Sequence, residues 1–250
     1  MDNMNALKLV PSNVKSKPLL GTTILIIEDS KYVCEAMRLM CLHSGARLRH
    51  ADTVAAARRH LRLYRPNIVI IDEGLPDGSG SEFAAELNGM SPRVDVIFGT
   101  SGESMCHHQF LKAGANGFIE KPFVSLSEFQ LKMLSALPES HFFPVSVSDT
   151  HEIVEPNPAI YAEDLRKAHD LLLNMPDIQT KKYVSQFLKS VCAIADDQEM
   201  LTALERDEEP QLLARLKSRC VPKRAVQSVG SEVALTKPVR LPSFSFCKPL

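Results

Sequence analysis

The hydrophobic residues in the first half of this chain are gathered into short runs separated by longer segments of mixed polarity. Four runs have the length of a β-strand and lie at 24–27, 68–71, 94–98 and 117–119, and a fifth, weak strand pattern lies at 47–50. Between the runs, apolar residues recur every three or four positions, as at Val54, Ala57, Leu61 and Tyr64. That spacing is typical of an amphipathic helix, whereas the runs at 24–27 and 68–71 are continuously aliphatic, as in strands that are covered on both faces.

This alternation of strands and helices predicts a parallel sheet built from repeated β–α units. Five units fit into residues 22–137, so we expect one small α/β domain with a doubly wound sheet of five parallel strands. Residues 1–21 are polar, contain Pro11 and Pro18 and lack periodicity, so we expect a flexible leader there.

The second half of the chain shows helical spacing and no strand pattern. Residues 138–158 contain four prolines, which is typical of a linker. Asn157 and Pro158 indicate a helix start, with asparagine as the N-cap and proline in the first helical position. The predicted helices lie at 158–175, 178–195, 200–204 and 212–216. We expect a helical docking or dimerisation segment over 159–206, followed by a basic, flexible tail over 207–250.

Composition excludes several classes of protein. The aliphatic runs are much shorter than the roughly 20 apolar residues that cross a bilayer, so we expect no membrane span. The first residues lack the apolar core of a signal peptide, so we expect no export. Six scattered cysteines without a CxxC pair are typical of a reduced, cytoplasmic protein: Cys34, Cys41, Cys106, Cys192, Cys220 and Cys247.

Charged and polar residues stand where the predicted strands end. The first strand runs into Glu28 and Asp29, and the third, fourth and fifth end at Asp72, Thr100 and Lys121. Open α/β sheets bind ligands at the carboxyl ends of their strands. Three carboxylates that meet at this edge repel one another unless a cation joins them, and a ligand set made only of oxygens favours Mg²⁺.

The central carboxylate of this group is a candidate nucleophile, since carboxylates form aspartyl-phosphate intermediates. Asp72 is followed by the turn-rich segment 75–80, which would leave its oxygen open to a phosphate donor. Thr100 and Lys121 would hold the remaining phosphate oxygens, while Mg²⁺ neutralises the developing charge.

The residues at these positions and their order resemble the receiver domain of bacterial response regulators. The matching stretches are 24–30 (ILIIEDS), 67–80 (NIVIIDEGLPDGSG), 96–101 (VIFGTS) and 113–123 (AGANGFIEKPF). The resemblance covers residues 22–137 and implies a flavodoxin-like sheet in a cytoplasmic two-component signalling switch. Such a protein catalyses only its own phosphorylation and slow autodephosphorylation, with a histidine kinase or histidine phosphotransfer protein as the donor.

The resemblance also implies how the acidic residues divide their roles. Asp72 is implied to be the phosphoacceptor, with Asp29 and Asp72 as direct ligands of Mg²⁺. The main-chain carbonyl of Gly74 would be a third ligand, and Glu28 would act largely through water. Mn²⁺ is the alternative ion for the same oxygen ligands.

Three further residues match the switch and phosphate-binding positions of the family. Thr100 and Phe118 match the switch pair, and Lys121 matches the phosphate-contacting lysine. Gly99 is a less usual residue before the threonine, and we expect it to loosen that strand end. Phe118 also has a simpler interpretation as a core aromatic.

Other polar residues are better explained without a site. His107 and His108 are adjacent in a predicted helix, so their side chains diverge and a solvated surface is favoured over a metal site. His169 is followed by a run of leucines rather than the lysine and glycine of a phosphotransfer helix. Asp52 follows the weak second strand and is predicted to be a helix N-cap.

The output of the switch is the part that the sequence leaves open. Residues 211–250 carry eight Lys or Arg and one Glu, a balance that would suit contacts with nucleic-acid phosphates. No helix-turn-helix or winged-helix pattern is present, so we favour a switch of protein–protein interactions, through a homodimer or a downstream protein. A DNA-binding transcriptional regulator is the alternative, and a separate enzyme in the C-terminal half has no supporting residues.

Overall fold

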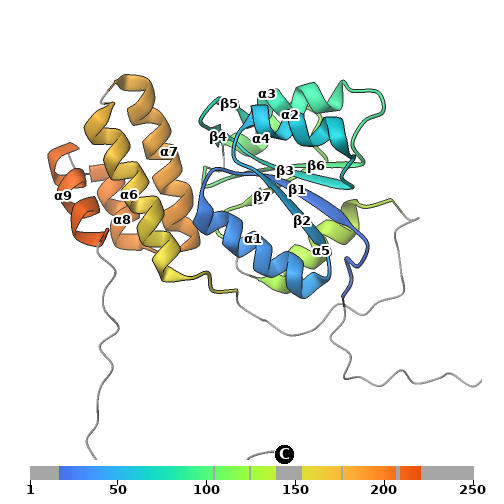
Figure 1. The fold of residues 1–250 in the computed structure, drawn as a ribbon, viewed down its shortest axis with the longest axis horizontal. Helices are drawn as coiled ribbons and strands as arrows, with labels where there is room; N and C mark the ends of the chain where they lie inside the picture. Colours follow the sequence, from blue (N-terminus) through green and yellow to red (C-terminus); the bar gives the residue numbers. More distant parts are fainter. Residues whose placement is uncertain are drawn as a thin grey trace, which may run out of the picture.

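The computed structural model of the chain describes residues 17–103, 105–123, 125–138, 154–175, 177–206 and 209–220. Figure 1 shows an α/β layer structure with a group of helices packed beside it. The sheet has the strand order β2-β1-β3-β6-β7, and all its pairs are parallel. Its strands are β1 (Thr23–Ile27), β2 (Arg47–Ala51), β3 (Ile68–Asp72), β6 (Val96–Ser101) and β7 (Gly117–Glu120). The prediction of a doubly wound sheet of five parallel strands is therefore confirmed.

Helices cover both faces of the sheet. In Figure 1, α1 and α5 lie on one face and α2, α3 and α4 on the other. These helices are α1 (Lys31–Ser44), α2 (Val54–Leu63), α3 (Gly80–Asn88), α4 (Cys106–Lys112) and α5 (Leu126–Ala136). Alternate residues of β1 serve the two layers: Ile24 and Ile26 join the cluster that contains Met37, whereas Leu25 joins the one that contains Phe83. Burial on both faces accounts for the uninterrupted aliphatic run.

A small antiparallel pair follows β3 and was not predicted. It consists of β4 (Gly74–Leu75) and β5 (Gly78–Ser79). Gly80 begins α3 directly afterwards, and a Cβ added to it would lie 2.0 Å from the carbonyl oxygen of Asp72. Only glycine therefore allows the chain to pass this close to the end of β3.

The N-cap of α2 differs from the prediction. Thr53, not Asp52, caps the helix, because its hydroxyl oxygen accepts a hydrogen bond from the amide of Ala56. The carboxylate of Asp77 accepts from the amides of Val54 and Ala55, two further donors of the first turn. The side chain of Asp77, in the β4–β5 turn, thus completes the cap of α2. The sequence around α2 could not predict this contact, because Asp77 lies more than 20 positions away.

The second half of the described chain is helical, as predicted, and packs on the first. Its helices are α6 (Pro158–Asn174), α7 (Ile178–Ile194), α8 (Gln198–Arg206) and α9 (Glu209–Arg219). Asn157 caps α6, since its side-chain oxygen accepts from the amide of Ala159 at 2.9 Å. The apolar faces of α6 and α7 belong to the same buried cluster as α1, and the rings of Tyr32 and Tyr161 lie 5.4 Å apart across that contact.

The expected leader and tail need correction where the structure describes them. Leu19 is fully buried and its amide donates to the carbonyl of Ser44 at 2.9 Å, so the end of the expected flexible leader is anchored to the domain at Pro18 and Leu19. Helix α9 occupies 209–219, inside the region expected to be a flexible tail, and contains the short helix predicted at 212–216. Most of the expected linker, with residues 1–16 and 221–250, lies outside the described residues, although Val154 is already buried in the core. No helix in the described ranges is long and apolar enough to cross a membrane.

Candidate functional site

A buried lysine joins two carboxylates at the carboxyl edge of the sheet. The ammonium of Lys121, just after β7, donates to Glu28 Oε2 at 2.7 Å and to Asp72 Oδ1 at 2.8 Å. The side chains of Lys121 and Glu28 are 0% and 1% exposed. The strand ends thus bring together three of the residues expected at this edge, because β1 and β3 are neighbours and β7 lies two strands beyond β3.

Burial and the neighbouring charges shift the pKa values of Glu28 and Lys121. Removal from water raises the pKa of Glu28 to about 8, Lys121 opposes the rise, and the nearby charges of Asp72 and Asp29 add to it. Burial lowers the pKa of Lys121, but the charges of Asp72 and Glu28 and their hydrogen bonds more than offset it, so its pKa is raised overall. Lys121 is therefore the cation that compensates the buried carboxylates in this structure.

Asp29 is engaged by a different set of partners, which come from the C-terminal helices. The ammonium of Lys167 on α6 donates to Asp29 Oδ2 at 2.6 Å and to its carbonyl oxygen at 3.2 Å. The hydroxyl of Tyr183 on α7 donates to the same carboxylate oxygen. Sequence reasoning missed both residues, because a lysine and a tyrosine on amphipathic helices carry no local sign of a partner more than 130 positions away.

Asp72 lies at the end of β3 beside the β4–β5 turn. Its second oxygen, Oδ2, accepts from the amide of Gly74 at 2.8 Å. The residue is only 4% exposed, so its carboxylate is not open to a donor in this arrangement. This differs from the expectation that the following turn would leave the oxygen accessible.

The expected switch residues lie on the neighbouring strands. Thr100 is paired with Asp72 in the β3–β6 register, and its hydroxyl donates to the carbonyl of Ile119 at 2.8 Å. Phe118 on β7 is 7% exposed, with its ring stacked on His107 and tilted against Phe110. Phe118 therefore forms part of the core in this structure, as its simpler interpretation has it.

Gly99 has a packing role rather than a loosening one. A Cβ added to it would lie 2.1 Å from Cγ of Phe110, which is fully buried. The missing side chain makes room for this ring, so the expectation that Gly99 loosens the strand end is wrong.

The oxygen ligands at the carboxyl edge of the sheet fit a hard cation, although several of them already accept hydrogen bonds from lysine side chains. Glu28, Asp29 and Asp72 offer carboxylate oxygens and Gly74 a carbonyl, the ligand types that Mg²⁺ prefers. Among the residues described here, no group of three or more His, Cys, Asp or Glu side chains is arranged to hold a metal ion. Lys121 and Lys167 account for this, because each ammonium occupies carboxylate oxygens that a metal would need.

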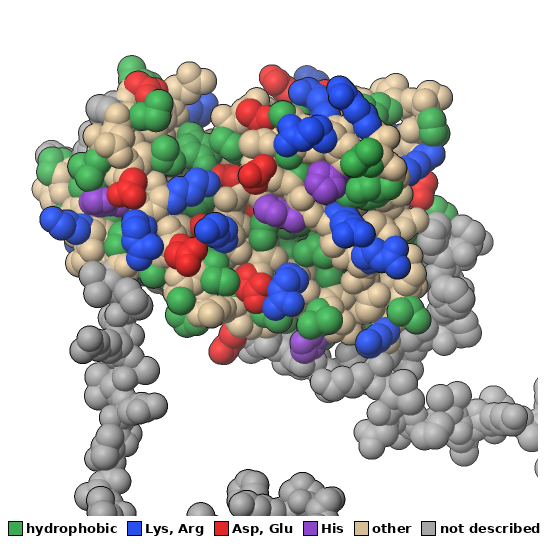
Figure 2. All heavy atoms as spheres, viewed as in Figure 1, with side chains coloured by type: hydrophobic (Ala, Val, Ile, Leu, Met, Phe, Trp, Pro, Cys, Tyr) green, Lys and Arg blue, Asp and Glu red, His purple; other side chains and the backbone are tan. Residues whose placement is uncertain are grey.

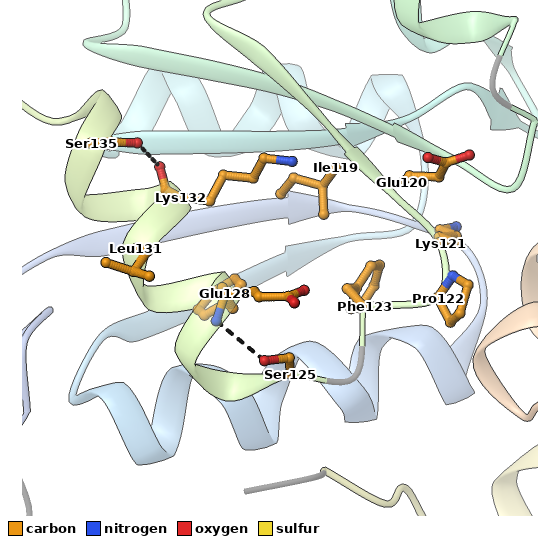
Figure 3. Close-up of a pocket in the computed structure, with 11 residues that line it drawn as sticks. Ile119, Glu120, Lys121, Pro122, Phe123, Ser125, Glu128, Leu131, Lys132 and Ser135 are labelled. Carbon is orange, nitrogen blue, oxygen red and sulfur yellow. Dashed lines mark hydrogen bonds between the residues drawn. The ribbon is translucent and has the colours of Figure 1, made fainter. Parts of the chain in front are cut away.

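A cavity flanks the site without reaching the candidate nucleophile. It has a volume of about 810 Å³ and lies between β7 and α5 (Figure 3). Lys121 and Pro122 stand at one end of it, and Lys132 on α5 donates to the carbonyl of Phe118 at 2.6 Å. Neither Asp29 nor Asp72 lines this cavity, so it offers no entry to their carboxylates.

Comparison with known proteins finds a family similarity in the first half of the chain. Residues 24–132 match the family model of the response regulator receiver domain. The KDP operon transcriptional regulatory protein KdpE of Escherichia coli is 30% identical over 116 residues, which cover 46% of this chain and 51% of that protein. The transcriptional regulatory protein KdpE of Mycobacterium tuberculosis is 31% identical over the same length, with the same coverage. This chain therefore matches about half the length of these curated relatives.

Solved structures resemble the same part of the chain. The chemotaxis response regulator CheY4 of Vibrio cholerae shares 22% identity, with a TM-score of 0.41, over 46% of this chain and 96% of that one. The receiver domain of the sensor histidine kinase PA1611 from Pseudomonas aeruginosa shares 24% identity, with a TM-score of 0.42, over 46% of this chain and 96% of that one.

Proposed function

We propose that this chain, whose residues 24–132 are a response regulator receiver domain, accepts a phosphoryl group on Asp72 in a Mg²⁺-dependent reaction. The observation that carries the proposal is the position of Lys121 between Glu28 and Asp72 at the carboxyl edge of the sheet. A lysine beside the nucleophile can compensate the charge of a transferred phosphoryl group, because its ammonium is already within hydrogen-bond distance of Asp72.

The acidic residues would hold the metal. Asp29 and Asp72 would bind Mg²⁺ directly, with the carbonyl of Gly74 as a third ligand and Glu28 acting through water. Mn²⁺ is the alternative ion. The cation would offset the negative charge of the phosphoryl oxygens and of the carboxylates around them. The chain itself supplies the nucleophilic oxygen of Asp72 and the buried ammonium of Lys121.

Thr100 and Phe118 would convert phosphorylation into a change of shape. The hydroxyl of Thr100 now bonds to the carbonyl of Ile119, and it would turn to the phosphoryl group on Asp72 instead. Taking a two-state switch from 1:99 to 99:1 needs about 5.5 kcal/mol of differential stabilisation. Hydrogen bonds to charged groups contribute roughly 1.5–3 kcal/mol each, so a new bond from Thr100 to the phosphoryl group would supply part of it, offset by loss of the bond to Ile119. Phe118 would repack into the space that Thr100 leaves.

A histidine kinase or a histidine phosphotransfer protein would be the donor, and the output would be a change of protein–protein contacts. The protein would act as a cytoplasmic signalling switch that catalyses only its own phosphorylation and slow autodephosphorylation. Helices α6 to α9 would supply the docking or dimerising surface.

The alternative output is the regulation of transcription through DNA binding. Its support is that the KdpE relatives are transcriptional regulatory proteins, although the matched region covers only half of them. On the face drawn in Figure 2, basic and acidic side chains are interspersed, which does not favour a continuous nucleic-acid track. A gel shift in graded salt separates the two outputs: a complex that is specific for one DNA sequence would favour the alternative.

The central test uses a small acyl phosphate with Mg²⁺ and reads the phosphoprotein by intact mass. Wild type should be labelled, and Asp72→Asn should not. Asp52→Asn is the matched control, because Asp52 is exposed and lies beyond β2. Equal labelling of Asp72→Asn and wild type would rule out Asp72 as the phosphoacceptor.

A further inference from the structure

Helices α6 and α7 cover the acidic edge of the receiver domain. Lys167 and Tyr183, one from each helix, both bond to Asp29. The ammonium of Lys167 also lies 4.5 Å from the ring centre of Phe187 on α7. A cation over an aromatic face is stabilised by the ring, so Phe187 adds a second interaction that holds the Lys167 ammonium in place.

Helix α7 also closes over the turn that follows Asp72. A Cβ added to Gly74 would lie 3.5 Å from Cβ of Gln186, which is van der Waals contact. On the far side of the site, the ammonium of Lys189 bonds to Glu103 at 2.9 Å. These contacts place α7 beside the turn that follows Asp72, which is only 4% exposed.

Helix α6 is anchored next to the site by a buried carboxylate. Asp164 is 1% exposed and accepts hydrogen bonds from the hydroxyl of Ser30 at 2.7 Å and from the amide of Tyr32 at 3.0 Å. Ser30 is the N-cap of α1 and directly follows Asp29. The covering helices are thus held to the backbone that positions the candidate metal ligand.

A phosphoryl donor and a metal ion both need atoms that this arrangement covers. The donor must approach the oxygen of Asp72, and Mg²⁺ must reach the carboxylate of Asp29, whose side chain is 4% exposed and whose Oδ2 Lys167 and Tyr183 now occupy. We infer that the α6–α7 pair is a lid over the phosphorylation site, in which the Lys167 ammonium is an internal cation that competes with Mg²⁺ for Asp29.

This inference rests on the proposed function, because it concerns the regulation of the same site. Binding of Mg²⁺ and closure of the lid oppose each other, and the effect is reciprocal: whatever opens the lid strengthens metal binding, and metal binding favours the open lid. Phosphorylation would then release the faces of α6 and α7 that contact the receiver domain.

The first experiment measures Mg²⁺ binding to the full chain by calorimetry. Lys167→Met keeps the length of the side chain and removes the charge, and it should tighten Mg²⁺ binding at least about tenfold, since it removes a charge-assisted hydrogen bond from Asp29. Tyr183→Phe should act in the same direction. Lys182→Met is the matched control, an exposed lysine on α7, and should leave the affinity unchanged. Unchanged affinity in Lys167→Met and Tyr183→Phe would overturn the competition.

The second experiment locks the lid. The distance between Gly74 and Gln186 suits a disulfide, whose Cβ atoms lie about 3.5–4.5 Å apart. In the double variant Gly74→Cys/Gln186→Cys, oxidation should reduce Mg²⁺ binding and acyl-phosphate labelling at least about tenfold below the level of the reduced form of the same variant. Loss of two free thiols on oxidation verifies that the bond has formed.

The outcomes separate the lid from the proposed function. Equal Mg²⁺ binding and labelling in the oxidised and reduced double variant would overturn the lid and leave Asp72 as the phosphoacceptor. Absence of labelling in wild type and also in Lys167→Met, whose lid is weakened, would remove the proposed function instead, and Mg²⁺ binding by Lys167→Met and by the locked protein would still decide the competition. The cysteine substitutions could themselves prevent labelling in the reduced state. In that case the lid is tested by Mg²⁺ binding alone, compared between Lys167→Met and wild type and between the oxidised and reduced double variant.

Discussion

The hydroxyl of Ser30 donates a 2.7 Å hydrogen bond to the carboxylate of Asp164, a residue 134 positions further along the chain. The same carboxylate accepts from the amides of Tyr32 and Lys31, two donors of the first turn of α1. A negative charge at a helix N-terminus is stabilised by the helix dipole and by the unpaired amides there. Burial raises the pKa of Asp164, while these hydrogen bonds oppose the rise.

This contact predicts that Asp164 stabilises the docking of α6 on α1. Asp164→Ala leaves the buried hydroxyl of Ser30 and two amides without their acceptor, which costs roughly 1–3 kcal/mol. Urea unfolding should show the loss as a lower midpoint, and hydrogen exchange should rise in the first turn of α1. Asp170→Ala, an exposed position on the same helix, should change neither. Equal stability of Asp164→Ala and wild type would contradict the anchoring role.

Lys121 is predicted to be required for the stability of the acidic edge. Lys121→Met removes the cation that pairs with buried Glu28 and Asp72, and breaking a buried ion pair in this way costs about 3–5 kcal/mol. The thermal midpoint should fall, and millimolar Mg²⁺ should recover part of it. Lys112→Met, an exposed lysine at the end of α4, is the control. A midpoint like that of wild type would mean that the carboxylates do not depend on this lysine.

Gly99 and Phe110 are predicted to be coupled. Gly99→Ala forces a methyl group into the buried ring of Phe110, and overpacking of this kind costs about 1–3 kcal/mol. Phe110→Ala alone should cost about 3–5 kcal/mol, and the double variant should lose less than the sum, because the small side chain relieves the clash. Gly89→Ala is the matched control, since its nearest neighbour, Glu86 O, would lie 3.6 Å away. If the losses in the free energy of unfolding are additive in the double variant, then groups other than the Phe110 ring relieve the clash.

Asp29 and Asp52 are predicted to differ in their effect on metal binding. Asp29→Ala should weaken Mg²⁺ binding and reduce phosphorylation, since it removes a proposed ligand, and it should also free Lys167 from its partner. Asp52→Ala should leave both properties intact, because Asp52 lies beyond β2 and contacts the hydroxyl of Thr53. Calorimetry with Mg²⁺ and acyl-phosphate labelling provide the measurements. An equal loss in the two variants would place the metal elsewhere.

The order of the elements and the position of the acidic edge could be predicted from the sequence alone. Buried parallel strands must be apolar along their whole length, so the runs that became β1 and β3 stand out. Once the strands are placed, the rule that their carboxyl ends share an edge brings Glu28, Asp72 and Lys121 together. Helical periodicity likewise predicted α6 and α7, because it depends only on residues three and four positions apart.

What covers that edge was decided by the tertiary structure. The apolar faces of α6 and α7 needed a partner, and the sequence predicted a docking or dimerisation segment without identifying the surface that covers it. Asp29 bonds to Lys167 and Tyr183, and Ser30 bonds to Asp164, in each case across more than 130 residues. The spacing of hydrophobic residues cannot predict a contact of this kind. The cap that Asp77 adds to α2 is of the same kind. Periodicity reports which face of an element is buried, whereas the identity of the surface that buries it depends on how distant elements pack together.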